Sequence, residues 1–103
     1  MQAGRMREAI TLIEPILNDR HEESGHREHE ARAEIRAARG TEIYEAVQVN
    51  SYLTHRCWIR YMKGIKASWR VLWNGRELQI DAAIPDAKRR WIELRLIELE
   101  PVT

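Results

Sequence analysis

The chain has 103 residues, of which 44% are hydrophobic and 32% charged. A chain of this length has room for one hydrophobic core, so we expect a single domain over residues 1–103. Seventeen basic and sixteen acidic residues leave a net charge of +1, which excludes strong global attraction to nucleic acid, so any contact with DNA needs a local patch.

Cysteine content and hydropathy indicate where the chain is found. Cys57 is the single cysteine. It therefore cannot form an internal disulfide, and its place in an apolar run predicts a small buried side chain. No apolar run reaches the length of a signal-peptide core or the roughly 20 residues of a membrane span. We therefore expect a chain that stays inside the cell unless it leaves as part of a particle.

The N-terminal third begins with a strand pattern. Ile10 and Leu12 alternate with Thr11, which predicts a strand over residues 9–14 that Pro15 interrupts. Residues 18–30 hold two acidic clusters, three histidines and a glycine, with no apolar residue to anchor them. This composition predicts a long mobile loop or hairpin tip between the first two strands.

A second strand and a short helix are predicted next. Small or apolar residues alternate with Arg and Glu over residues 31–37, which favours a strand. Thr41 can cap a helix, and Ile43, Ala46 and Val47 follow at the spacing of one helical face. The pattern predicts a helix of two turns at most between the second and third strands.

The C-terminal half is rich in strand signals. Asn74-Gly75 separates Trp69–Trp73 from Arg76–Ile80, and this dipeptide supplies the two positive φ angles of a type I′ hairpin turn. The β-branched and aromatic runs at 51–61 and 91–99 predict two further strands. Six short strands predict a mainly β fold, a small antiparallel β-barrel of SH3-like or meander type, because closure removes exposed edges.

The histidines do not form a convincing catalytic or metal site. His21, His26 and His29 lie among glutamates, which are donor types that divalent metals accept, but their spacing does not match a helical two-histidine site. A solvated loop is favoured over a metal site, since gathering ligands from a flexible loop costs entropy. His55 is expected to be partly buried with one hydrogen bond.

No sequence motif for catalysis is recognisable. The sequence lacks a glycine-rich phosphate loop, a nucleophile elbow and a Cys-His pair with a plausible partner. We therefore predict no catalytic residues, no metal, no cofactor and no enzymatic activity.

The tryptophans admit two interpretations. Trp69 and Trp73 share one face of a predicted strand, and Trp58 faces away from Ile59. With arginines nearby, Trp58, Trp69 or Trp73 could stack bases, which would make the chain an SH3-like or OB-like nucleic-acid-binding barrel. Packing in a core or a subunit interface is favoured, because a chain without Phe builds its bulk from Trp, Leu and Ile.

Basic side chains gather at three places, and charge runs on loops are usually solvated faces. The alternative is that a modest patch, repeated around a closed ring, lines a channel that holds DNA through its phosphates. Besides the pair Arg5 and Arg7, the candidate DNA-facing residues are Lys63, Lys66, Lys88, Arg89 and Arg90.

A set of short motifs carries a resemblance to a known family. In chain order they are Gly4-Arg5-Met6-Arg7-Glu8-Ala9-Ile10-Thr11-Leu12, Ala33-Glu34-Ile35, Gly40-Thr41-Glu42, Thr54-His55-Arg56, Ile59-Arg60-Tyr61 and Arg70-Val71-Leu72-Trp73-Asn74-Gly75-Arg76. In this order and at these spacings they resemble the small head-closure proteins of tailed phages, also called head-tail joining proteins or stoppers. The resemblance spans nearly the whole chain.

The resemblance implies a structural protein of the head-tail connector of the virion. Such proteins form a dodecameric ring beneath the portal or adaptor ring, close the DNA channel after packaging and provide the surface on which the tail docks. The implied partners are portal or adaptor proteins, tail proteins and, non-specifically, packaged double-stranded DNA. The chain is expected to be a monomer when isolated, and to occupy the bacterial cytoplasm during assembly and the virion thereafter.

The resemblance also implies roles for segments of the chain. The channel-closing segment would comprise Gly40, Thr41, Glu42, Ile43, Tyr44, Glu45, Ala46 and Val47. Contacts with neighbouring subunits would come from the N-terminal residues and the predicted hairpin tip, namely Gly4, Arg5, Met6, Arg7, Arg20, Glu22 and Glu23.

Overall fold

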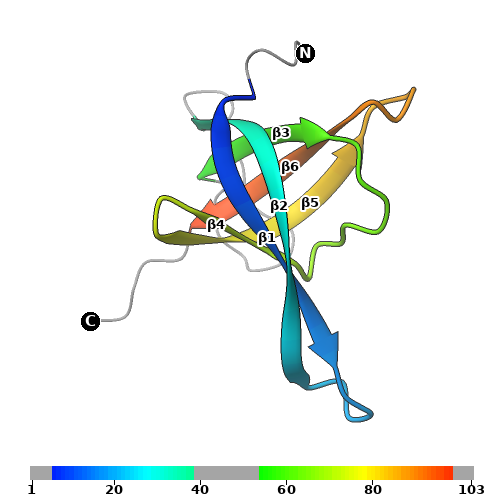
Figure 1. The fold of residues 1–103 in the computed structure, drawn as a ribbon. Helices are drawn as coiled ribbons and strands as arrows, with labels where there is room; N and C mark the ends of the chain where they lie inside the picture. The colour runs from blue at the N-terminus through cyan, green and yellow to red at the C-terminus, as the bar shows by residue number, and fades with distance from the viewer. Residues whose placement is uncertain (1–5, 39–53, 99–103) are drawn as a thin grey trace.

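The computed structural model describes residues 6–38 and 54–98, in which six antiparallel strands form a closed barrel (Figure 1). Around the barrel the strands follow the order β1-β2-β3-β6-β5-β4. Their bounds are Glu8–Leu17 for β1, Glu23–Ala37 for β2, His55–Arg60 for β3, Arg70–Trp73 for β4, Arg76–Pro85 for β5 and Trp91–Glu98 for β6. The predicted six-stranded antiparallel β-barrel is confirmed.

Alternation along the strands places one apolar row of each strand inside the barrel. Leu94 on β6, for example, is fully buried, whereas Glu93 and Arg95 beside it are only half-buried. The apolar core consists of Ile10, Leu12, Ala33, Cys57, Ile59, Trp69, Val71, Leu78, Ile80, Ile92, Leu94 and Leu96. Cys57 is buried as predicted, and burial raises the pKa of its thiol to about 12.

The β4–β5 hairpin turns at Asn74-Gly75 as the sequence predicts. Asn74 has φ 51° and Gly75 has φ 73°, the two positive angles of a type I′ turn. The turn fixes the register in which Trp73 pairs with Arg76 and Val71 with Leu78. Val71 and Trp73 therefore point to the same side, as expected from their shared parity.

Of the two predictions for residues 18–30, the hairpin tip is confirmed and the mobile loop is wrong over most of its length. β2 already begins at Glu23 and runs for 15 residues, paired with β1 from Glu8 to Leu17. Backbone hydrogen bonds to β1 hold this polar stretch as a strand, so it needs no apolar anchor of its own. Pro15 lies within β1, where β4 pairs only as far as Ile13, so its missing N–H falls on an open edge.

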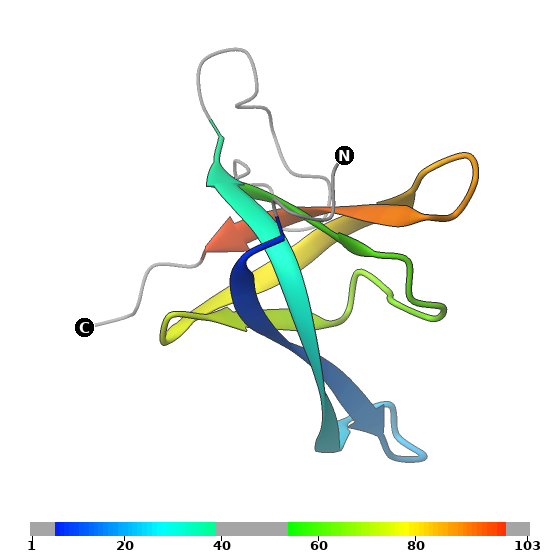
Figure 2. The same cartoon turned by 45° about the horizontal axis from the view of Figure 1, so that its top comes forward.

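The outer part of the β1–β2 hairpin extends away from the barrel as an arm (Figures 1 and 2). We call residues 14–27 the arm, because β4 pairs with β1 only up to Ile13 and β3 pairs with β2 only from Ala33. At its outer end Ile16 is 38% exposed and Leu17 is 54% exposed. The arm is thus a two-stranded ribbon with two open edges and exposed apolar side chains.

β5 is longer than predicted because a bulge interrupts its alternation. It runs from Arg76 to Pro85, and its register against β6 shifts between Ile80 and Ala82. The intervening Asp81 is buried, and the extra residue reverses which side of the strand the later side chains face. The period-two alternation that predicts the strand therefore stops at Ile80, although the strand itself continues.

Two predictions involve residues 39–53. The predicted helix over Thr41–Val47 and the first residues of the predicted strand 51–61 lie outside the described residues. No helix occurs in residues 6–38 or 54–98, and so none there could cross a membrane. The expectation of a single domain over 1–103 stays a prediction.

Candidate functional site

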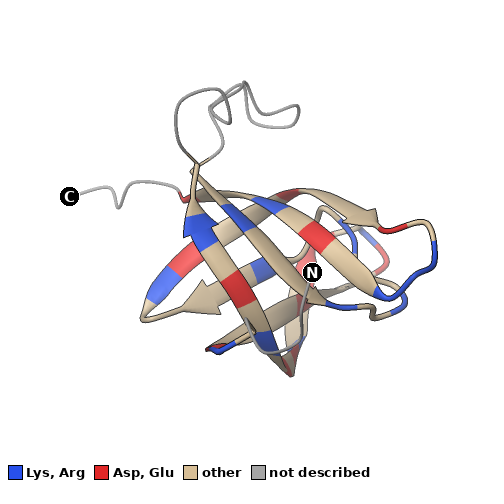
Figure 3. Ribbon diagram, turned by 90° about the horizontal axis from the view of Figure 1, so that it is seen from above, with Lys and Arg blue, Asp and Glu red and all other residues tan. Residues whose placement is uncertain are grey.

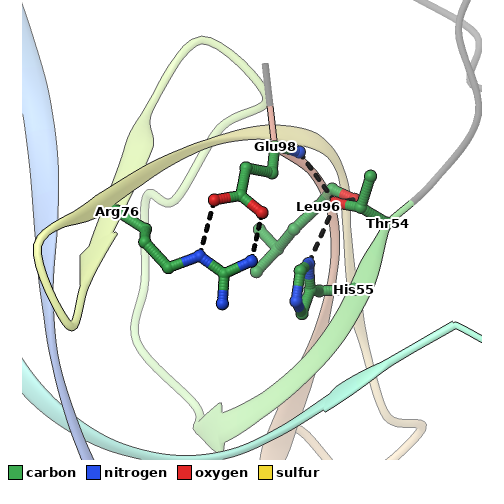
Figure 4. A network of polar contacts seen from close by, with 5 residues as sticks. All are labelled: Thr54, His55, Arg76, Leu96 and Glu98. Atoms are coloured by element: carbon green, nitrogen blue, oxygen red, sulfur yellow. Dashed lines mark hydrogen bonds and ion pairs between the residues drawn. The ribbon is translucent and has the colours of Figure 1, made fainter. Parts of the chain in front are cut away.

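One end of the barrel is closed by a polar network beside the point where residues 39–53 leave it (Figure 4). The backbone N–H of Ala38 donates to the carbonyl of Thr54 at 2.9 Å and so joins the ends of β2 and β3. The Thr54 hydroxyl lies 3.3 Å from the carbonyl of Leu96 and accepts the backbone N–H of Glu98 at 2.7 Å. Thr54 therefore connects the base of the 39–53 segment to β6.

His55 and Arg76 complete this network. The Nδ1 atom of His55 lies 2.9 Å from the Thr54 hydroxyl, and the guanidinium of Arg76 pairs with the carboxylate of Glu98. Burial lowers the pKa of His55, the nearby charge of Arg76 lowers it further, and Glu98 opposes both effects. His55 is 7% exposed, so the prediction of a partly buried histidine with a hydrogen bond is confirmed.

Trp73 forms the aromatic part of the same end. Its ring lies edge-on to His55 with centroids 5.7 Å apart, and the guanidinium of Arg76 lies 5.2 Å from its centre. Its indole N–H donates to Glu8 at 3.1 Å. Trp73 and Arg76 thus bring β1, β3, β4 and β5 together over the core.

The opposite end, toward the arm, is closed by Trp69 and His29. Their rings are stacked with centroids 5.2 Å apart and planes 9° from parallel, and Trp69 is only 6% exposed. His29 contacts the carboxylate of Glu14 at 2.9 Å. Since side chains fill the interior and cover both ends, this barrel is a solid body and not a pore.

A tryptophan in contact with two arginines lies on the outer surface over β2, β3 and β6. The guanidinium groups of Arg36 and Arg56 each lie 4.8 Å from the centre of the Trp58 ring. Glu93 accepts hydrogen bonds at 3.0 Å from both Arg56 and Arg95. Burial opposes ionisation of Glu93, but these arginines outweigh it and lower the pKa of the carboxyl.

This arginine surface was missed by the sequence prediction. Arg36, Arg56 and Arg95 each face outward in a period-two pattern, but only the pairing of β2 with β3 and of β3 with β6 places them side by side. Of the three predicted stacking platforms, Trp69 is buried, Trp73 covers the core, and only Trp58 lies on the outer face. Of the three tryptophans proposed to stack on bases, two are therefore not placed to do so.

The predicted subunit-contact residues fall into different environments. Met6 is buried against the barrel, and Arg7 is exposed. Arg20, Glu22 and Glu23 are exposed at the tip of the arm, where β1 turns into β2. Gly4 and Arg5 lie outside the described residues. That these residues together form one surface for contact with neighbouring subunits stays a prediction.

Two of the three predicted clusters of basic residues lie on loops that begin next to each other. The backbone N–H of Tyr61 donates to the carbonyl of Arg90 at 2.9 Å, so the loop with Lys63 and Lys66 begins beside the turn with Lys88, Arg89 and Arg90. All five basic side chains are exposed. Lys63 and Lys66 follow the C-terminal end of β3, and Thr54 precedes its N-terminal end, so this basic loop begins about 20 Å from Thr54 along the six-residue strand.

The histidine-rich stretch is divided between the arm, which holds His21 and His26, and the barrel, which holds His29. His26 lies 3.9 Å from Glu28, while His29 stacks on Trp69. Within residues 6–38 and 54–98, no group of three His, Cys, Asp or Glu side chains could hold a metal ion.

Comparison with known proteins assigns this barrel to a family. The model of the phage head completion protein family matches residues 1–99. The chain belongs to this family. The chain is also similar to protein SF1141 from Shigella flexneri 2a, whose solution structure superposes with a TM-score of 0.68 at 28% identity, covering 95% of this chain and 96% of that chain. No curated protein gives a match.

Membership of the head completion family confirms the resemblance drawn from the sequence motifs and gives the chain a structural role in closing the phage head. A head completion protein works with other proteins of the phage head and tail and is a component of the virion.

Proposed function

We propose that the chain completes the phage head by forming a ring, dodecameric as the family resemblance implies, beneath the portal or adaptor. There it closes the DNA channel after packaging and presents a docking surface to the tail. The isolated chain is a monomer, because the portal side provides the template for ring closure. Since the interior of each barrel is filled, the channel lies between copies and DNA does not pass through a barrel.

The observation that carries the channel-closing role is the clamped base of residues 39–53. Ala38 and Thr54 are joined by a backbone hydrogen bond, and Thr54 is fixed to Leu96 and Glu98 on β6. By chain length alone, a segment of fifteen residues whose two ends meet can extend at most about 25 Å. A segment with this reach on a rigid base suits the obstruction of a channel, and Gly40–Val47 is the part we assign to it.

The arm and the N-terminal residues supply contacts with neighbours. The arm has exposed Ile16 and Leu17 and open edges on both strands, which suit contact with another protein chain. Arg20, Glu22 and Glu23 at its tip would add polar contacts. Lys63, Lys66 and Lys88–Arg90 would contact the phosphates of packaged DNA without reading its sequence.

The test uses the phage or prophage that encodes the chain. Deleting the gene should leave packaged heads that fail to join tails, and supplying the intact chain should restore infectious particles. Replacing residues 40–47 by a Gly/Ser segment of equal length should preserve assembly but allow DNA to leak. The measurement is the nuclease-protected DNA in purified heads, with Ala67→Gly and Ser68→Gly in the β3–β4 loop, outside the assigned segment and the basic residues, as control. Full DNA retention by the 40–47 variant would contradict the assigned segment.

A further inference from the structure

The outer surface of the barrel carries a row of arginines across three strands. Cross-strand pairing aligns Arg36 on β2 with Arg56 on β3, and Arg56 with Arg95 on β6. Like charges placed directly opposite one another repel, so such a row is unfavourable unless other groups offset it. Here Trp58 lies under two of the guanidinium groups and Glu93 binds two of them.

The adjacent row adds apolar surface to these arginines. It aligns Glu34, Trp58, Glu93 and Ile84 across β2, β3, β6 and β5, and Ile84 is 40% exposed. An open groove of about 700 Å³ passes between these residues and Trp91. We call the outer face formed by Arg36, Arg56, Arg95, Trp58 and Ile84 the arginine wall.

The opposite side of the barrel has a row of complementary character. Pairing of β2, β1, β4 and β5 aligns Glu30, Thr11, Leu72 and Glu77, with Leu72 38% exposed between the two glutamates. The neighbouring Arg70 is already bound by Glu23 at 3.0 Å and by Glu77 at 3.4 Å. We call the face formed by Glu23, Glu30, Glu77 and Leu72 the acidic wall.

The strand order places the two walls back to back. In the closed order β1-β2-β3-β6-β5-β4, the β3–β6 contact lies opposite the β1–β4 contact. Viewed from above, charged positions of both signs lie on the strands (Figure 3), and the register gathers arginines about the β3–β6 contact and glutamates about the β1–β4 contact. A body with complementary faces on opposite sides associates head to tail, and such contacts close into rings when the rotation permits.

We propose that the arginine wall of one copy binds the acidic wall of the next copy, and that this contact joins neighbouring subunits in the ring. The inference rests on the proposed function, because it names the surfaces by which the ring forms. An exposed apolar residue, Ile84 on one wall and Leu72 on the other, lies among charged residues on each side, the usual composition of a protein interface. Arginine and tryptophan are also the side chains most often central to such contacts.

A second copy fits the arginine wall better than DNA does. Three of its arginines already contact Trp58 or Glu93, so the surface is an ordered mixture of ring, carboxylate and guanidinium, and not a field of extended cations. Binding to phosphates would also leave the acidic wall without a function. A neighbouring copy accounts for both walls with one contact.

The first experiment reverses the charge of each wall in the phage that encodes the chain. One variant carries Arg36→Glu and Arg95→Glu, the second Glu30→Arg and Glu77→Arg, and the third all four substitutions. In either two-site variant both walls have the same sign, and the yield of completed particles should fall about a hundredfold. The four-site variant has complementary walls again and should recover to within about tenfold of the natural chain.

A control separates wall contacts from total charge. Ser68→Glu with Ala87→Glu also makes the net charge more negative, but at exposed positions outside both walls and outside the proposed DNA-contacting residues, and should leave ring formation intact. Circular dichroism and the melting temperature of each purified variant establish that the barrel folds. If the four-site variant fails while the Glu30 and Glu77 variant works normally, the arginine wall binds DNA or another partner and the inference is overturned.

The second experiment traps the contact in assembled particles. Chains with Arg36→Cys and Glu30→Cys together, treated with a bismaleimide, should give a ladder of cross-linked oligomers, whereas either single cysteine should give monomer. The native Cys57 does not interfere, because it is fully buried and its pKa is raised to about 12. Dimers from a single-cysteine variant, or no ladder from the double variant in completed particles, would overturn the proposed pairing of walls.

The outcomes also separate this inference from the proposed function. If deleting the gene leaves particles complete and infectious, the head-completion role itself fails. If deletion blocks completion but the two-site variants complete normally, only the pairing of walls fails, and the ring forms through other surfaces such as the arm.

Discussion

A tryptophan and a histidine close each end of the barrel, but the two pairs are built differently. Toward the arm, His29 lies flat on the buried Trp69, and its contact with Glu14 is about one-third exposed on both sides. At the other end, His55 is almost fully buried and meets Trp73 edge-on. There Thr54, Arg76 and Glu98 form a hydrogen-bonded network around it.

The difference follows from what each end has to hold. The arm end continues into a ribbon whose own ladder of hydrogen bonds keeps it in place, so a single apolar cover over the core suffices. The other end must fix the two chain positions between which residues 39–53 depart, and these lie on different strands. We infer that the arm end contributes chiefly apolar burial and that the network end contributes directed hydrogen bonds.

The largest predicted effect tests the apolar end. Trp69→Ala should lower the free energy of unfolding by about 3–5 kcal/mol, because a large buried ring is lost and a cavity remains. Trp73→Ala should cost less, since Trp73 is only half-buried. Urea denaturation followed by circular dichroism measures both. A loss from Trp73→Ala equal to that from Trp69→Ala would remove the distinction between the two ends.

The second prediction tests the directed bonds. Thr54→Val keeps the shape of the side chain but leaves the N–H of Glu98 and the ring of His55 without their partner, so the free energy of unfolding should fall by about 1–3 kcal/mol. The matched control is Thr11→Val on the outer face, where the hydroxyl makes one long, exposed contact with Glu30 at 3.5 Å. It should change stability by no more than about 0.5 kcal/mol.

Hydrogen exchange gives this second prediction a local measurement. The amide of Glu98 should lose protection in Thr54→Val, because its hydrogen bond to the Thr54 hydroxyl is removed. Amides in the β4–β5 hairpin, such as Leu78, should lose no more protection than the change in global stability requires. Uniform loss across the barrel would show that Thr54 acts only through overall stability.

The sequence was sufficient to predict the strands whose signal is local. The Asn74-Gly75 turn, the burial of Cys57 and the six-stranded barrel all follow from turn chemistry and period-two alternation. The first half of β2 was missed because its order comes from pairing with β1 and not from apolar residues of its own. The end of β5 was missed because the bulge at Asp81 changes the alternation.

The candidate surfaces depend still more on pairing between distant segments. Thr54 and Glu98 meet, as do Arg36, Arg56 and Arg95, only after β2, β3 and β6 have found their register. Nothing in the local sequence of any one strand specifies that register. The sequence could therefore identify single residues such as His55, but not the network or the arginine wall to which they belong.

A third prediction uses the protonation of His55. Its pKa is lowered in the folded chain, so the unfolded chain binds the proton more readily, and stability decreases as pH falls below about 6.5. The slope of the unfolding free energy between about pH 7 and 5 should diminish in His55→Gln. Loss of ionisation at Glu93 and Glu98, whose pKa values are also lowered, acts in a separate and more acidic range. An NMR titration of the His55 ring showing a pKa at or above 6.5 would contradict this prediction.

The smallest predicted effect returns to the arm end. Glu14→Gln removes the charge that contacts His29 but leaves the stacking of His29 on Trp69 in place. Because both partners are about one-third exposed, water competes for the contact and the change in unfolding free energy should stay within about 1 kcal/mol. The change in unfolding free energy caused by Glu14→Gln should also diminish at high salt, whereas the change caused by Thr54→Val should not depend on salt. A salt-independent loss as large as that of Thr54→Val would mean that the arm end, too, depends on a directed polar contact.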